Sequence, residues 1–176
     1  MDVFNETLHS WQNFYFMIGG AAATLAGLMF VALSLGLHLI TKVTQTDLNL
    51  FATPSISYFV STLLLAAVML VPTYTPPALA LILCLGGIAG MVKTLPHVTK
   101  LIQTARKHQD FTLADWLTQV VMPTLTYMLF LGAALCLVVN QWSIAFMGLW
   151  IAAIFLLIAA ISNTWSLVMW IVDRSN

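Results

Sequence analysis

Long runs of uncharged, mostly apolar residues fill most of this sequence, and they constrain its fold more than any other feature. Only 7% of the 176 residues are charged, while 61% are hydrophobic. A soluble domain needs more charges to cover its surface. Because a helix that crosses a bilayer needs about 20 largely apolar residues, each run can be counted as a candidate span. The runs predict five transmembrane helices, over residues 11–40, 54–71, 76–92, 117–139 and 142–172.

No stretch remains between these runs for a soluble domain. The sequence therefore predicts an all-α, polytopic membrane helical bundle, with residues 1–176 forming a single transmembrane domain. Apolar residues recur at helical steps near the start, so residues 1–15 predict either an outer interfacial helix or the frayed start of the first span. Residues 93–111 predict a cytoplasmic extension of the third helix.

Basic residues occur only after the first, third and fifth runs. The segments at the other ends of the spans contain no Lys or Arg. Positively charged loops remain on the cytoplasmic side, so this pattern predicts an external N-terminus and a cytoplasmic C-terminus. The basic residues are Lys42, Lys93, Lys100, Arg106, Lys107 and Arg174.

Four of these basic residues follow the third run: Lys93, Lys100, Arg106 and Lys107. They predict a stripe that contacts lipid headgroups. One interpretation is specific binding of anionic lipid or the lining of a vestibule. The other, which the positive-inside rule favours, is a solvated helix next to the membrane that only sets the topology.

Small and hydroxyl-bearing residues recur every seven positions in the first helix, which is the spacing of a helix-packing seam. Such residues let backbones approach closely in lipid. One row contains Gly20, Gly27, Ser34 and Thr41, and the adjacent row contains Thr24, Val31 and His38.

The third and fifth helices repeat this spacing, with Ala80, Gly87 and Thr94 in the third and Ala145, Ala152, Ala159 and Ser166 in the fifth. Three such rows exceed the close contacts that one small bundle needs. We therefore expect a homo-oligomer.

Polar residues within the spans gather toward the predicted cytoplasmic side. Because a polar side chain at membrane depth must face protein or water, they predict a hydrated or hydrogen-bonded cavity that opens inward. His38 is either part of this cavity or an interfacial histidine, and Asn163 is either part of it or one side of an interhelical hydrogen bond. The other members of this cytoplasmic-side polar layer are Tyr58, Ser61, Thr94, His97, Tyr127 and Ser162.

Motifs for enzymatic chemistry are absent from the sequence. It contains no His-Glu-x-x-His, nucleophile with its base, or phosphate loop, and no Asp or Glu lies inside a predicted span. Cys84 and Cys136 lie in apolar runs, where a thiol usually behaves as a small hydrophobe. A haem would have only His38 and His97 as candidate ligands near one depth. We expect no catalytic residues, no metal, no cofactor and, with a net charge of zero, no nucleic-acid partner.

Two function classes remain. In the first, which the polar layer slightly favours, the chain forms a passive channel whose axis is lined by the first-helix rows and gated by the apolar residues Phe30 and Val31. In the second, the chain is a scaffold, assembly or regulatory subunit whose rows pack against partner membrane proteins. Both classes use the same small residues.

The first helix also carries the pattern Trp11-x-x-Phe14-Tyr15, followed by AAATLAGLMFVALSL over residues 21–35. This pattern resembles the first helix of small uncharacterised multi-pass proteins of bacterial inner membranes. The resemblance covers one span. It implies a location in a prokaryotic plasma membrane and no particular activity.

Overall fold

The computed structural model describes residues 2–39, 45–72, 74–105 and 116–175. All the regular structure in these ranges is helical, which confirms the predicted all-α class. The elements are α1 (Asp2–Leu39), α2 (Gln45–Met69), α3 (Pro76–Ala105), the short π-helix η1 (Leu117–Val121), α5 (Met122–Val138) and α6 (Trp142–Ser175).

Three helices contain segments that are long and apolar enough to cross a membrane. These segments are Val3–Leu35 of α1, Pro76–Pro96 of α3 and Trp142–Met169 of α6. The apolar segments of α2 and α5, Thr53–Met69 and Met122–Val138, are shorter. Length and composition thus support a membrane protein with at least three candidate spans.

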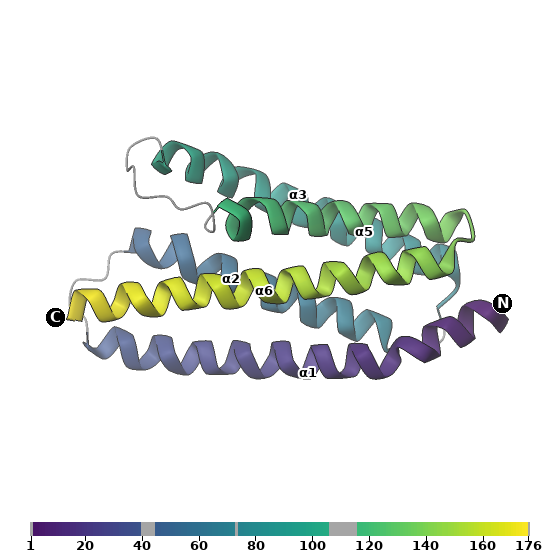
Figure 1. Ribbon diagram of the computed structural model, residues 1–176, viewed down its shortest axis with the longest axis horizontal. Helices are drawn as coiled ribbons and strands as arrows, with labels where there is room; N and C mark the ends of the chain where they lie inside the picture. Colours follow the sequence, from purple (N-terminus) through teal and green to yellow (C-terminus); the bar gives the residue numbers. More distant parts are fainter. Residues whose placement is uncertain (1, 40–44, 73, 106–115, 176) are drawn as a thin grey trace.

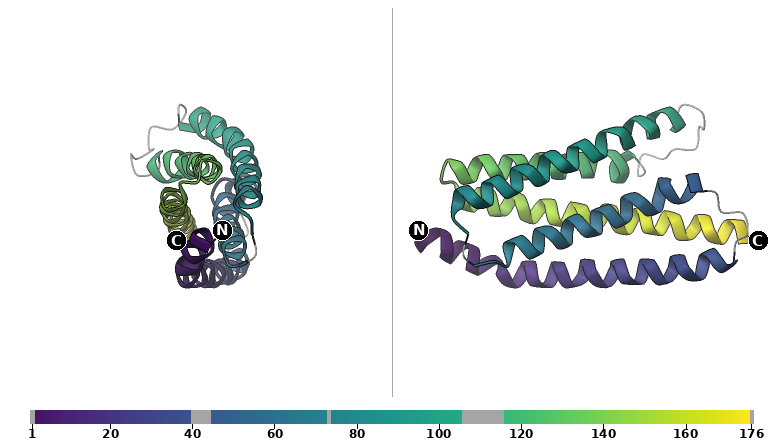
Figure 2. Two further views of the ribbon diagram at one scale, coloured as in Figure 1. Left: turned by 90° about the vertical axis from the view of Figure 1, so that its right-hand side faces the viewer. Right: turned by 180° about the vertical axis from the view of Figure 1, so that it is seen from behind.

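The helices form an elongated bundle in which successive helices run in opposite directions (Figure 1). The two ends of the chain consequently lie at opposite ends of the bundle. Seen end-on, α6 lies between α1 and α5, while α2 and α3 lie on the other side (Figure 2). Helix α6 packs against α1, α2 and α5, and the bundle is completed by the pairs α1 with α2 and α3 with α5.

Helices α1, α2 and α3 extend well beyond the apolar runs from which they were predicted. Helix α2 begins at Gln45 and contains Pro54 within it, and α3 continues through Pro96 to Ala105. Residues 93–105 of the predicted third-helix extension are therefore helical, and 106–111 lie outside the described residues. Helix α1 runs without a break from Asp2, so the segment from that residue to 15 continues directly into the first apolar run.

Local backbone chemistry explains the ends of α5. Pro123 cannot donate a hydrogen bond, and its ring crowds the carbonyl one turn earlier in a helix. The chain widens there into η1, where the Met122 N–H bonds to the Leu117 carbonyl. At the other end Asn140 has φ 61°, a left-handed conformation that Asn tolerates, and the Gln141 N–H closes the helix on the Cys136 carbonyl at 2.8 Å.

The core runs along α6. Its row of Ala145, Ala152 and Ala159 is buried, as the seven-residue spacing predicted for close packing. At the N-terminal end of α1, Phe4 is buried against α6, with ring centroids 5.4 Å from Trp142 and 6.1 Å from Phe146. These contacts hold the first turns of α1 against the start of α6.

Candidate functional site

The small-residue rows of α1 lie mostly on the outside of the bundle. Gly20, Thr24, Gly27 and Ser34 are exposed, and the proposed gate residues Phe30 and Val31 are each 57% exposed. His38 belongs to α1 but its side chain lies outside the described residues, as does all of Thr41. Within one chain, the described part of these rows therefore lines no internal cavity.

The glycine that brings α1 close to a neighbouring helix is Gly19, adjacent to the predicted row. A Cβ atom on Gly19 would lie 2.8 Å from the Cβ of Ala66 on α2, whereas one on Gly20 or Gly27 would meet nothing within 4 Å. Because neighbouring residues of a helix point about 100° apart, Gly19 can contact α2 while Gly20 faces outward.

The corresponding row of α3 behaves differently. Ala80, Gly87 and Thr94 are all buried, and a Cβ on Gly87 would lie 2.9 Å from the Cδ2 atom of Leu131 on α5. With the α6 row buried as well, α1 carries the small-residue face that the chain leaves uncovered. The α1 face consists of the exposed small residues Gly20, Thr24, Gly27 and Ser34 together with the adjoining Phe30 and Val31.

The hydroxyl groups of several polar residues are satisfied by nearby backbone carbonyls. Thr24 donates to Gly20 at 2.8 Å, Thr62 to Tyr58 at 2.9 Å and Thr94 to Gly90 at 2.9 Å. A threonine that bonds to the preceding helical turn needs no water. These hydroxyls therefore act as hydrogen-bonded parts of their own helices.

The predicted polar layer separates into two groups. Ser61 of α2 and Tyr127 of α5 line a groove, and Tyr58 of α2, Thr94 of α3 and Tyr127 line a hollow that adjoins it. Ser162 and Asn163 lie on α6 and line neither the groove nor the hollow. Asn163 is buried, and its Oδ1 atom has no hydrogen-bond partner among the described residues. His97 lies on α3, with its side chain outside the described part of the chain.

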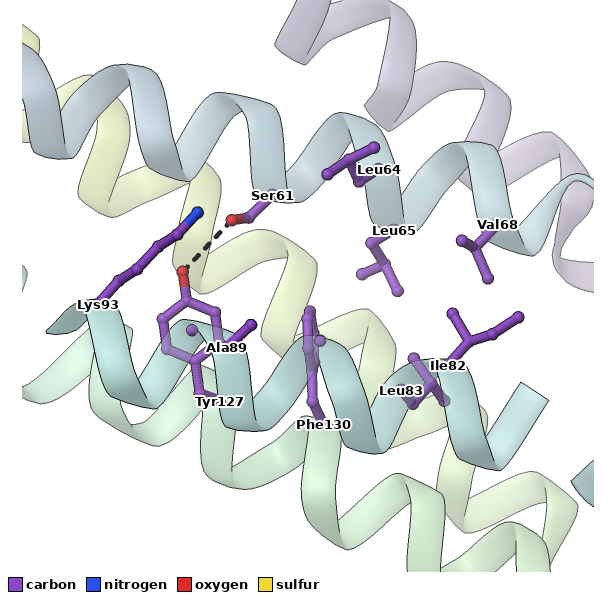
Figure 3. Close-up of a pocket in the computed structure, with 12 residues that line it drawn as sticks. Ser61, Leu64, Leu65, Val68, Ile82, Leu83, Ala89, Lys93, Tyr127 and Phe130 are labelled. Atoms are coloured by element: carbon purple, nitrogen blue, oxygen red, sulfur yellow. Dashed lines mark hydrogen bonds between the residues drawn. The ribbon is translucent and has the colours of Figure 1, made fainter. Parts of the chain in front are cut away.

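The groove runs between α2 and α3 and has a volume of about 330 Å³. These two helices follow each other in the sequence, yet their described backbones seldom come close together, whereas α3 packs closely on α5. Tyr127 and Phe130 of α5 form the floor, with their rings edge to face and their centroids 5.9 Å apart. The walls and floor are shown in Figure 3 and consist of Ser61, Leu64, Leu65, Val68, Ile82, Leu83, Gly86, Ala89, Gly90, Lys93, Tyr127 and Phe130.

A hydrogen bond spans the floor and one wall of this groove. The hydroxyl oxygens of Ser61 and Tyr127 are 3.3 Å apart, which joins α2 to α5 (Figure 3). Gly90 makes this position of Tyr127 accessible, because a Cβ atom at Gly90 would overlap the tyrosine ring. The close approach of α3 and α5 thus sets the depth of the groove.

A second hollow of about 460 Å³ adjoins the groove and shares Lys93 and Tyr127 with it. Its remaining lining is more polar and comprises Thr53, Pro54, Ser57, Tyr58, Val92, Thr94 and Pro96. The combined site is therefore apolar at one end and polar at the other. Lys93 is the cation among the described residues that line this combined site.

Of the other predicted headgroup residues, the Lys100 side chain and the whole of Arg106 and Lys107 lie outside the described residues.

The described residues contain no group of three or more His, Cys, Asp or Glu side chains that could hold a metal ion. Both cysteines, Cys84 and Cys136, are free thiols. The arrangement offers a binding site with one cation, two hydroxyl groups that bond to each other and an apolar groove.

Reasoning from sequence alone missed the apolar half of this site. Leu64, Leu65, Ile82, Leu83 and Phe130 look like ordinary lipid-facing or core residues in a transmembrane run. The available signal was the pair Gly86 and Gly90, one helical turn apart, which indicates a close neighbour for α3. That pair does not reveal that the neighbour is α5 and that α2 stands apart.

Comparison with protein-family models, with curated proteins and with solved structures finds no match for this chain.

Proposed function

We propose that this chain is a non-enzymatic, homo-oligomeric integral membrane protein that acts as a scaffold or assembly subunit. In this proposal all five helices cross a bacterial inner membrane, with the N-terminus outside and the C-terminus in the cytoplasm. The alternating helix directions and the positions of the basic residues support this topology (Figure 1).

The observation that carries the proposal is the uncovered α1 face. The chain buries the equivalent rows of α3 and α6 and leaves this one exposed. Small residues are the usual means by which helices associate in lipid, where hydrophobicity provides no drive for association. The Thr24 hydroxyl already bonds to its own helix, so this part of the face can be covered by another helix without leaving a polar group unpaired.

The oligomeric state of the purified chain, reconstituted in lipid nanodiscs or mild detergent, tests this proposal. We expect an oligomer by light scattering, and we expect Gly27→Leu to reduce it to the monomer by separating the paired helices. Gly132→Leu is the matched control, because Gly132 is an exposed helical glycine of α5 with nothing within 4 Å of its Cβ position. A monomeric wild-type chain, or equal effects of the two substitutions, would contradict association through α1.

A passive channel is the second candidate, and the polar hollow beside Lys93 favours it. An inward-facing vestibule requires polar groups at one end of the spans, as Thr53, Ser57 and Lys93 provide. In that case α1 faces from several subunits would line an axis, with Phe30 and Val31 as a hydrophobic gate.

Flux through liposomes that contain the purified chain distinguishes the two functions. A channel predicts ion or solute flux that Phe30→Ser increases, because a hydroxyl at the constriction favours wetting. A scaffold predicts no flux in either protein, together with stable recovery of partner membrane proteins in pull-downs.

A further inference from the structure

We propose that the groove between α2 and α3 binds one anionic phospholipid from the bilayer. The phosphate lies at Lys93, and one acyl chain lies along the apolar part of the groove. This inference goes beyond the proposed scaffold or channel function and does not depend on oligomer formation.

The apolar part of the groove has the shape and composition that a hydrocarbon chain needs. Leu65 and Leu83 are buried in its walls, Phe130 lies in its floor, and Leu64 is 60% exposed at its rim. Its volume of about 330 Å³ lies within the range of small-molecule sites, roughly 300–1,000 Å³. Because α2 and α3 are not packed together, the groove opens to the side of the bundle, where a membrane supplies lipid.

The polar end has groups that recognise a phosphate. The Lys93 side chain extends from α3 toward α2, and its amine lies on the same side as the hydroxyls of Ser61 and Tyr127 (Figure 3). No Asp or Glu is among the described residues that line the groove or the adjoining hollow. Among the described lining residues the amine thus has no acidic partner, and an anion from outside the chain complements it.

The hydroxyl pair adds a hydrogen-bond donor. Ser61 and Tyr127 share one hydrogen bond, and each hydroxyl has one hydrogen. One O–H is used between them, so the other can donate to a phosphate oxygen beside Lys93. The site thus offers a positive charge and a neutral donor at one end of an apolar channel.

These features select a phospholipid among anionic ligands. Inorganic phosphate has no apolar part that could contact the apolar lining. A zwitterionic lipid brings its own cation close to Lys93, and the two positive charges repel each other. A fatty acid shares the chain and the negative charge, so oleate is included in the test as the competing ligand. Lys93 also lies near the predicted cytoplasmic ends of the spans, at the depth of lipid phosphates.

The test is native mass spectrometry of the delipidated full chain after addition of dioleoyl-phosphatidylglycerol, dioleoyl-phosphatidylcholine or oleate. We expect retention of one phosphatidylglycerol molecule per chain, in preference to phosphatidylcholine. Lys93→Gln should weaken phosphatidylglycerol retention by about fivefold, as expected for the loss of one cation near a lipid phosphate. Lys100→Gln is the control for net charge, because it removes a cation further along the same helix.

The role of the apolar part of the groove is tested with Ala89→Phe, which places a ring in the groove from an exposed position of α3. Ala67→Phe, at an exposed position of α2 outside the groove, is its matched control. Loss of the bound lipid in Ala89→Phe alone supports the site, provided that the two variants have equal melting temperatures. If Ala89→Phe fails to fold, the comparison of Lys93→Gln with Lys100→Gln decides the question.

Three results would overturn the proposal. The first is equal retention of phosphatidylglycerol and phosphatidylcholine, which would indicate non-specific lipid around the bundle. The second is equal weakening by Lys93→Gln and Lys100→Gln, which would indicate a diffuse charge effect. The third is retention of oleate without phosphatidylglycerol, which would make the groove a fatty-acid site.

Discussion

Gly90 of α3 leaves open the space into which the ring of Tyr127 of α5 packs. Any side chain at residue 90 would displace that ring. The displacement would also move the Tyr127 hydroxyl away from Ser61, 3.3 Å from it on α2. The absence of one methyl group thus links the packing of α3 on α5 to the floor of the groove.

We expect Gly90→Ala to destabilise the protein by about 1–3 kcal/mol, because overpacking forces the tyrosine ring or the helix to shift. Gly132→Ala should be neutral or stabilising by up to about 1 kcal/mol, since Ala is the better helix former and nothing lies near its Cβ position. Thermal unfolding in detergent, followed by circular dichroism, compares the two variants. Equal melting temperatures would show that Tyr127 does not occupy this space.

The hydrogen bond between Ser61 and Tyr127 should make a modest contribution. Ser61→Ala and Tyr127→Phe each remove it, and a double-mutant cycle should yield a coupling energy of about 0.6 kcal/mol, typical of hydrogen bonds between membrane helices. Urea or detergent denaturation of the four proteins measures this coupling. Strict additivity would mean that α2 and α5 are not joined at this point.

Substitution of Asn163 is expected to change stability in the opposite direction from the substitutions above. Its buried Oδ1 atom has no partner among the described residues, and an unsatisfied buried polar group costs about 1–3 kcal/mol. We therefore expect Asn163→Leu to leave the melting temperature unchanged or to raise it. A clear decrease in the monomeric protein would indicate that Asn163 bonds to another group of the same chain.

The N-terminal end of α1 should contribute to folding as well as to topology. Phe4 is 2% exposed and packs on Trp142 and Phe146, so Phe4→Ala should cost about 3–5 kcal/mol. Val3→Ala is the neighbouring control, because Val3 is 66% exposed. Similar thermal stability of the two variants would show that the first turn of α1 separates from α6.

The periodic residues of α3 and α6 predict close packing, and both rows are buried in the bundle except for Ser166 at the end of the α6 row, which is half-buried. The same spacing in α1 did not predict which way its row faces. Gly19 and Gly20 are adjacent small residues, yet Gly19 packs on Ala66 and Gly20 faces outward. Small residues indicate that two helices can approach; the neighbour is set by the packing of the other helices.

The helical class and three of the five predicted spans could be read from apolar runs, because the membrane fixes the length of a helix that crosses it. The groove between α2 and α3 could not be predicted from the sequence. Helices joined by a short turn usually pack together, and the turn after Met69 suggests that α2 and α3 do so. Instead, Gly87 and Gly90 draw α3 onto α5. The sequence predicts Lys93 as a residue for lipid headgroups, but the apolar part of the groove beside it depends on the packing of α3 on α5.

The position of α6 has a consequence for how the bundle is assembled during synthesis. α6 is made after all the other described helices, and it is the one that packs on α1, α2 and α5. Without α6, the pair of α1 with α2 and the pair of α3 with α5 are joined across the groove by the hydrogen bond between Ser61 and Tyr127 and by few other close approaches of their described backbones. Insertion of α6 then connects the two pairs, because α6 packs on α1, α2 and α5. The groove between α2 and α3 is not covered by α6 and stays open to the side of the bundle.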